Sequence, residues 1–128
     1  MGCDIHGYIE YRYSSGKRQW FNFAAVDINR DYVLFGYMAG VRKKDVEPVV
    51  PLRGFPEDAS LWVLSEWHEW DGDGHHPGWL TYDELYKAHS HVVSYRNEGE
   101  FTMVAVLAAM HSLQCSGMET RLTFWFDN

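Results

Sequence analysis

The chain is poor in cysteine, in basic residues and in long hydrophobic runs. Its two cysteines, Cys3 and Cys115, are far apart, so the sequence does not have the disulfide-dense pattern of a small secreted domain. The first ten residues include Asp4, His6 and Glu10, which argues against the apolar stretch of a signal peptide. No apolar run approaches the roughly 20 residues needed to span a bilayer. We therefore expect a cytoplasmic protein without a membrane partner.

Basic residues number 11 against 18 acidic ones, which gives a formal net charge of −7. Direct binding of DNA or RNA needs a basic surface along the phosphates, so this composition argues against it. The segment from Gly54 to Tyr86 contains no lysine or arginine. It contains eight acidic residues: Glu57, Asp58, Glu66, Glu69, Asp71, Asp73, Asp83 and Glu84. The segment predicts either a solvated surface that favours solubility or an acidic face for a protein partner.

Motifs of the common nucleotide and hydrolase sites are missing as well. The chain has no P-loop, no glycine-rich dinucleotide turn, no Gly-x-Ser-x-Gly elbow and no Cys-x-x-Cys pair. It is rich in aromatic residues, at 16%, with six tryptophans and eight tyrosines. Because this exceeds what the core of one small domain needs, we expect some rings to line a pocket or an interface.

A length of 128 residues fits one domain, over residues 1–128. Period-two alternation predicts three strands, over residues 3–13, 18–26 and 121–127. Helical spacing and capping residues predict four helices, over residues 31–39, 57–70, 81–89 and 100–114. The glycine-rich segment 71–78 predicts a loop. We expect an α+β fold: a small antiparallel sheet of three or four strands, built from an N-terminal hairpin and a C-terminal strand, with about four helices packed on one face.

The helix predicted over residues 100–114 carries a candidate pair. His111 and Cys115 are four residues apart and fall on an apolar stripe with Phe101, Val104 and Ala108. We expect this stripe to face the core, which makes Cys115 a buried free thiol beside a hydrogen-bonded histidine. The alternative is that both side chains contact one metal ion.

The first predicted strand carries another candidate pair. Asp4 and His6 are two residues apart, so their side chains point to the same face. A carboxylate beside an imidazole can orient a general base, which makes His6 or His75 a candidate acid or base and Asp4 a candidate orienting group. Asp4 and His6 could also join Asp73 and His75 of the predicted loop in binding a divalent metal ion. The alternatives are a polar strand face and a polar surface loop.

Three arginines, Arg30, Arg42 and Arg53, flank the first predicted helix and the segment after it. Guanidinium groups bind phosphate or carboxylate in a bidentate geometry. Their grouping in a chain of negative net charge predicts a local anion pocket, in which Tyr32 or Trp79 would stack a base. The alternative is three unrelated surface arginines.

The two ends of the chain are distinctive, because the first six residues read MGCDIH and the last five read FWFDN. The internal pattern consists of Arg30 to Tyr32, Leu34-Phe35, Ala39 to Arg42, Arg53 to Pro56, Asp58, Ser60, Asp73, His75, Trp79 to Thr81 and Glu84-Leu85. Together these residues resemble small uncharacterised phage-encoded proteins over nearly the whole chain. The resemblance implies an accessory protein that acts in the cytoplasm of an infected bacterium. It also implies that the polar residues of this pattern belong to a functional site. His76 departs from the family, whose members often have serine there. The family has no assigned activity, so the resemblance transfers no catalytic role.

Three functions stay open on these grounds. The first is a phage accessory protein that counters host defence by binding a phosphate-bearing, nucleotide-like small molecule through an Arg/His/Asp pocket. The second is a hydrolase acting on such a ligand, with or without a divalent metal ion. The third is an acidic inhibitor whose residues 57–84 imitate nucleic acid and bind a host protein, with a strongly negative surface and no small-molecule pocket. A homo-oligomer is compatible with all three.

Overall fold

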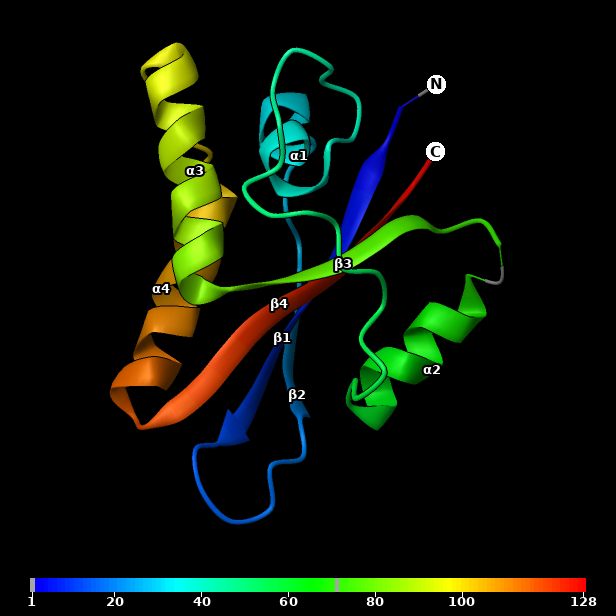
Figure 1. The fold of residues 1–128 in the computed structure, drawn as a ribbon, viewed down its shortest axis with the longest axis vertical. Coiled ribbons are helices and arrows are strands. Elements are labelled where there is room, and N and C mark those ends of the chain that lie inside the picture. The colour runs from blue at the N-terminus through cyan, green and yellow to red at the C-terminus, as the bar shows by residue number, and fades with distance from the viewer. Residues whose placement is uncertain (1, 71) are drawn as a thin grey trace.

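A computed structural model describes residues 2–70 and 72–128 (Figure 1). Its four strands are β1 (Asp4–Tyr13), β2 (Phe21–Val26), β3 (His75–Thr81) and β4 (Met118–Asp127). Its four helices are α1 (Tyr32–Ala39), α2 (Leu61–Glu69), α3 (Tyr82–Arg96) and α4 (Phe101–Cys115). The strands form one antiparallel sheet in the order β2-β1-β4-β3. The predicted α+β fold, with its N-terminal hairpin and C-terminal strand, is confirmed.

The two long central strands, β1 and β4, come from opposite ends of the chain. They pair without interruption from Asp4 opposite Asp127 to Tyr13 opposite Met118. The pairing brings the two termini together at one end of the sheet (Figure 1). The distinctive ends of the sequence are therefore neighbours in space.

Strand β3 was not predicted, because its segment was expected to be a loop up to Gly78. It pairs with the outer side of β4, with an irregularity between His75 and Gly78. Proline cannot donate a hydrogen bond in a central strand but is tolerated on an edge strand, and Pro77 lies in this one. The pairing with β4 makes this segment a strand, and its own residues carry no alternation that would reveal it.

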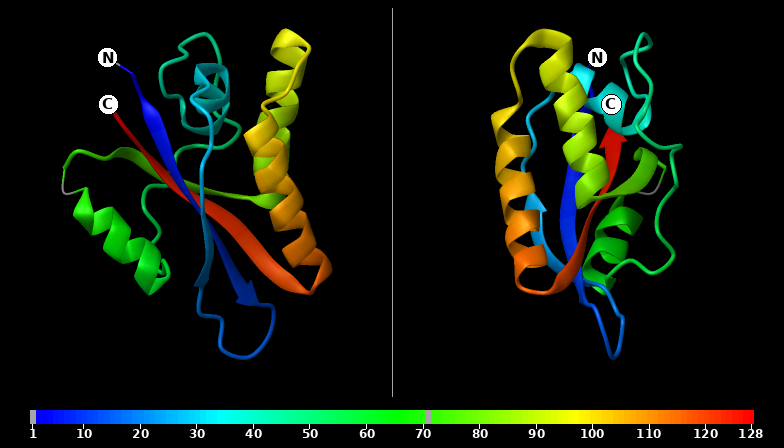
Figure 2. Two further views of the ribbon diagram at one scale, coloured as in Figure 1. Left: turned by 180° about the vertical axis from the view of Figure 1, so that it is seen from behind. Right: turned by 60° about the vertical axis from the view of Figure 1, so that its left-hand side comes forward.

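Helices cover both faces of the sheet, so the expectation that all of them pack on one face was wrong. Leu122, Phe124 and Phe126 of β4 point into a large core with residues of α1, α3 and α4. Trp125 points to the opposite face, where it packs with Val63 of α2. Figure 2 shows α2 on the opposite side of the sheet from α3 and α4. Helices are needed on both faces because β4 is buried on both faces, from Thr120 to Phe126.

The helix boundaries follow their capping residues. Helix α1 ends at Gly40, whose φ of 70° is the left-handed conformation expected there. Helix α2 begins later than predicted, because the Ser60 side chain accepts a hydrogen bond from the backbone N–H of Val63. Helix α3 starts with the predicted capping box of Thr81 and Glu84, but it continues well beyond residue 89, because Val92 extends its buried stripe.

The orientation predicted for α4 was wrong. Its buried residues are Met103, Val106, Leu107 and Met110. The predicted stripe is exposed, including His111 and Cys115, whose Nε2 and Sγ atoms are 3.5 Å apart. Helix α4 contains no aspartate, glutamate, lysine or arginine, so its sequence does not distinguish the core side from the outer side. Among the described residues, no helix has the length and apolar character required to cross a lipid bilayer.

Candidate functional site

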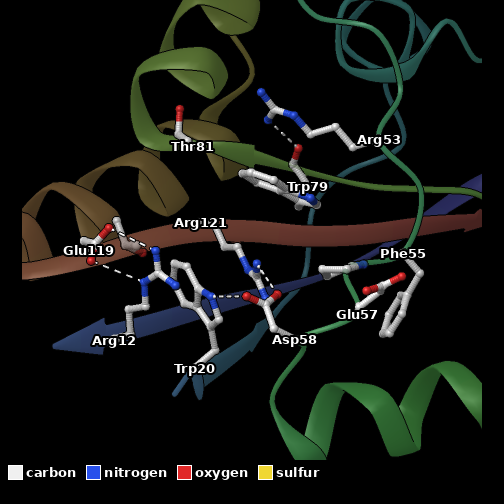
Figure 3. A pocket seen from close by; sticks show the side chains of 12 residues that line it. Arg12, Trp20, Arg53, Phe55, Glu57, Asp58, Trp79, Thr81, Glu119 and Arg121 are labelled. Atoms are coloured by element: carbon white, nitrogen blue, oxygen red, sulfur yellow. Dashed lines mark hydrogen bonds and ion pairs between the residues drawn. The ribbon is translucent and has the colours of Figure 1, made fainter. Parts of the chain in front are cut away.

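A cavity of about 680 Å³ opens on the face of the sheet that also carries α2 (Figure 3). Its polar walls come from the two central strands, where Arg12 of β1 lies opposite Glu119 of β4. Two tryptophans contribute aromatic walls: Trp20, which precedes β2, and Trp79 of β3. Arg53 and Phe55 lie on the segment that crosses the outer edge of β3 (Figure 3). Four segments distant in sequence thus meet at this cavity.

The floor of the cavity rests on a buried ion pair. Glu10 is fully buried, and its Oε1 atom accepts hydrogen bonds from Arg121 Nε at 2.8 Å and from Thr123 Oγ1 at 2.7 Å. Its Oε2 atom accepts from the backbone N–H of Ser60 at 2.7 Å. Both carboxylate oxygens therefore have the hydrogen-bond partners that a buried acidic side chain requires. The same contacts join β1, β4 and the start of α2.

The Arg121 guanidinium lies between the two tryptophans. Its carbon atom is 4.0 Å from the ring centroid of Trp20 and 5.5 Å from that of Trp79. The side chain is only 3% exposed, and its Nη1 atom donates to Asp58 Oδ1 at 3.0 Å. Its Nη2 atom is buried and has no hydrogen-bond partner among the described residues. Because this amino group has no exposed surface, Arg121 acts on the cavity through the positive charge of its guanidinium and not through a free donor.

Two further arginines stand at the sides of the cavity. Arg12 donates to Glu119 at 3.2 and 3.3 Å and lies 4.5 Å from the Trp20 centroid. Arg53 donates to both carboxylate oxygens of Glu84, at 2.6 and 2.5 Å, and to the carbonyl of Trp79 at 3.1 Å. The Arg53 guanidinium also covers the Trp79 ring, 4.1 Å from its centroid. Arginine stacked on tryptophan keeps its charge while presenting a flat surface to a ligand.

Hydrogen bonds from arginine keep the nearby carboxylates ionised. The hydrogen bonds from Arg53 lower the pKa of Glu84 from 4.5 to about 2, against an opposing effect of partial burial. Burial acts to raise the pKa of Asp58, but the hydrogen bonds from Arg121 and Trp20 outweigh it, so this pKa lies below its ordinary value. At neutral pH the arginines therefore face ionised partners, and the cavity is close to charge balance.

Replacing Glu84 with glutamine should lower the free energy of unfolding by about 2 kcal/mol at pH 7. The pKa of Glu84 is lower in the folded than in the unfolded chain, so the stabilisation is present above pH 4.5 and is lost as the pH falls towards 2. Urea denaturation of both proteins should show a smaller difference at pH 3 than at pH 7. An equal difference at the two pH values would contradict this assignment. Asp83→Asn, in the same turn of α3, is the control.

The structure separates the residues predicted to bind phosphate. Arg53 and Trp79 line the cavity. Arg30 instead forms a bidentate ion pair with Asp4, with both N···O distances at 3.0 Å, at the end of the sheet near the termini. Arg42 lies over the Tyr32 ring, 5.5 Å from its centroid. The tyrosine hydroxyl accepts a hydrogen bond from the backbone N–H of Cys3 at 3.1 Å, which places this group beside the start of β1. The three arginines therefore do not form one pocket.

The candidate metal ligands do not converge either. Asp4 and His6 share the α2 face, but His75 lies opposite Phe126, whose side chain points to the other face. Asp73 is exposed in the turn before β3. In residues 2–70 and 72–128, no three His, Cys, Asp or Glu side chains are placed to hold one metal ion. His6 lies on β1 and His75 on β3, and β4 lies between these two strands. Because the two side chains also point to opposite faces of the sheet, they cannot reach the same ion.

The two candidate catalytic histidines have partners other than those expected. His6 Nε2 is 2.6 Å from Asp127 Oδ2, so Asp127 and not Asp4 orients this ring. His75 stacks on Phe126, and its Nε2 atom contacts the Asn128 side chain. Both histidines lie at the end of the sheet near the termini, outside the residues that line the 680 Å³ cavity.

Sequence reasoning did not single out four polar or aromatic residues of the cavity: Arg12, Trp20, Glu119 and Arg121. The sequence did offer one indication of these residues. Glu10 and Arg12 are two residues apart in a predicted strand, so both charged side chains point to the same face, and Arg121 is the first residue of the predicted strand RLTFWFD. A strand buried on both faces accommodates such charges only when they are paired. The partner of each, however, depends on the β1–β4 register.

Comparison of the chain with protein-family models, with curated proteins and with solved structures found no match. The geometry of the cavity is therefore the basis for assigning a function.

Proposed function

We propose that this protein binds a phosphate-bearing, nucleotide-like small molecule in the cavity between Trp20 and Trp79. The observation that carries the proposal is the gathering of three arginines, Arg12, Arg53 and Arg121, around the rings of Trp20 and Trp79 in one cavity. A volume of about 680 Å³ falls within the range of small-molecule sites. Aromatic rings next to guanidinium groups suit a ligand with both a planar part and an anionic part.

The binding mode follows from the exposure of each group. Arg12 and Arg53 are 22% and 28% exposed, so a phosphate can reach their guanidinium groups from solvent. Trp20 is only 6% exposed, whereas Trp79 is partly exposed. Because the Arg53 guanidinium covers the Trp79 ring, 4.1 Å from its centroid, a base would stack on this guanidinium, which the Trp79 ring supports from behind.

The charge balance limits which phosphate ligands fit. Arg12 and Arg53 are each paired with a carboxylate, Glu119 and Glu84 respectively. A ligand with many phosphates would meet these carboxylates as well as the arginines, and the like charges would repel. We therefore propose one or two phosphate groups, as in a nucleoside monophosphate or a cyclic nucleotide. Millimolar to micromolar affinity is the corresponding expectation.

The observations favour binding over the other two functions. A protein inhibitor that imitates nucleic acid requires no small-molecule cavity, and two of its acidic residues, Asp58 and Glu84, are paired with arginines. A hydrolase built on Asp4, His6 and His75 would act outside the cavity. The resemblance of the termini to phage-encoded proteins supports a role in the infected cell: sequestering a nucleotide signal of host defence, which needs no turnover.

Trp79→Ala and Arg53→Gln should each weaken ligand binding about 10- to 100-fold, because each removes one aromatic or charged contact of about 1–3 kcal/mol. Isothermal titration calorimetry with nucleoside monophosphates and cyclic nucleotides measures the loss. Arg30→Gln is the matched control, since Arg30 is an exposed arginine paired with Asp4 at the distant end of the sheet.

Native mass spectrometry after incubation with a bacterial nucleotide extract identifies an unknown ligand. A retained adduct that Trp79→Ala removes and Arg30→Gln retains supports the proposal. If the nucleotides of the extract are altered and no adduct is retained, the hydrolase replaces the binding protein as the proposed function. A bare protein mass with an unchanged extract would refute both functions.

A further inference from the structure

The sheet has one covered edge and one open edge. At the β3 edge, Arg53 donates to the Trp79 carbonyl, and Leu52 packs so closely on Gly78 that an added Cβ would lie 2.8 Å from its Cδ1 atom. Pro77 further limits pairing there. The other edge is β2, and no described strand pairs with its outer side. In the left view of Figure 2, β2 runs between α2 and α4.

Large apolar side chains surround the β2 edge on both faces. On the α4 side, a cavity of about 350 Å³ lies between the two elements and is lined by Phe23 and Phe101, which are 51% and 75% exposed. On the α2 side, a cavity of about 450 Å³ is lined by Leu61 and Trp62, which are 76% and 56% exposed. Isolated exposed hydrophobic residues are ordinary, but a contiguous group of this kind marks an interaction surface.

This surface is also free of charged residues along its two main elements. Strand β2 reads FNFAAV and helix α4 reads FTMVAVLAAMHSLQC, with no aspartate, glutamate, lysine or arginine in either. The whole chain has a net charge of −7, so most of its surface would repel a second copy. At a two-fold axis each residue meets its own copy or a near neighbour, and charges there would face like charges. Asp27, which follows β2 and lines the cavity on the α4 side, is the one acidic residue in that lining. A surface with so little charge on an acidic protein fits a second copy of the same chain.

We propose that two copies of this protein associate through the β2 edge and α4 about a two-fold axis. The β2 strands of the two protomers lie antiparallel and join the sheets, and α4 packs beside α4 of the partner. Ala105 and Ala108 are exposed on α4, and their small side chains permit close approach of the helices. The irregularity in β2 opposite Ile9 and Glu10 shortens the regular edge, so side-chain burial contributes most of the stability.

A stable dimer needs an interface of about 800 Å² on each partner. That is roughly a ninth of the 6983 Å² accessible on this chain, and β2 and α4 have to bury it together. The contact through α4 is on the other face of the sheet from the proposed ligand site, because Phe101 lies on the α4 face and Arg121 on the α2 face. On the α2 side, the cavity beside β2 shares Trp20 with that site.

Sedimentation equilibrium or light scattering should give twice the 14.9 kDa mass of one chain at micromolar concentrations. Phe101→Glu should shift the protein to monomer, with a dimer about 100-fold weaker, because each protomer then places a carboxylate in the apolar interface. Tyr86→Glu, on α3, is the matched control, since this exposed aromatic lies outside the surface and should leave the dimer unchanged.

Mixing Phe101→Glu with Phe101→Lys should restore a dimer, which separates loss of the contact from misfolding. A wild-type protein that is monomeric at 100-fold higher concentration would overturn the proposal, as would a Phe101→Glu protein that stays dimeric. Ligand binding by the Phe101→Glu monomer should equal that of the wild type. A failure of the dimer and a failure of the ligand site are thus distinguished.

Discussion

Replacing Arg121 with methionine should lower the free energy of unfolding by about 3–5 kcal/mol, the largest effect of a single ion-pair substitution that we expect here. Arg121 and Glu10 are 3% and 0% exposed at their side chains. Removing the guanidinium leaves a buried carboxylate with only the hydrogen bonds of Ser60 and Thr123. The uncompensated charge, and not the loss of the contact itself, makes this substitution costly.

Urea denaturation followed by tryptophan fluorescence measures this loss. The double variant Glu10→Gln with Arg121→Met should recover a large part of the stability, because neither side chain then carries a buried charge. Asp58→Asn is the control for the outer ion pair of Arg121, and should cost less than about 1 kcal/mol because the Asp58 side chain is 62% exposed. A double variant as unstable as Arg121→Met would contradict the role given to the charge.

Replacing Trp125 with alanine should lower the free energy of unfolding by about 3–5 kcal/mol. Trp125 is fully buried and stacks on Tyr8, with ring centroids 5.2 Å apart, and contacts Trp67 of α2 at the same centroid distance. It is the largest side chain between α2 and the sheet, so the alanine variant should release α2. Since Phe55 also contacts Trp125 and lines the ligand cavity, ligand binding should weaken as well.

Trp125→Phe should cost far less than Trp125→Ala. The Nε1 atom of Trp125 is buried without a hydrogen-bond partner in the described part of the chain, so phenylalanine removes an unsatisfied donor while retaining most of the ring contact. Thermal and urea unfolding of the two variants give the comparison, with exposed Tyr86→Ala as a control expected within about 0.5 kcal/mol of wild type. Equal losses in the free energy of unfolding for Trp125→Phe and Trp125→Ala would contradict this prediction.

The fold was predictable wherever local sequence carries its own signal. Alternation along β1 and β4, the capping box at Thr81 and the glycine at position 40 each specify an element by local backbone and hydrogen-bond geometry. Strand β3 carries no such signal, because its hydrogen bonds go to β4 and its irregularity removes the alternation. Helix α4 was placed correctly but turned wrongly, since a helix without charged residues has more than one apolar side.

The candidate site was predicted only in part. Of the residues predicted to bind a ligand, Arg53 and Trp79 line the same cavity. The predicted companions of Arg53, however, are at the other end of the sheet, where Arg30 pairs with Asp4. Proximity in sequence grouped them, whereas the cavity gathers residues more than 100 positions apart, such as Arg12 and Arg121.

The sequence by itself determined the elements other than β3, the acidic character and the residue types available for a site, because propensity, capping and charge are local properties. Tertiary structure alone decided which residues meet. The β1–β4 register puts Glu10 opposite Arg121 and puts His6 and His75 on opposite faces, and a shift of one residue would reverse every side chain. Register depends on burial of β4 on both faces at once, which is a property of the assembled sheet and not of any segment.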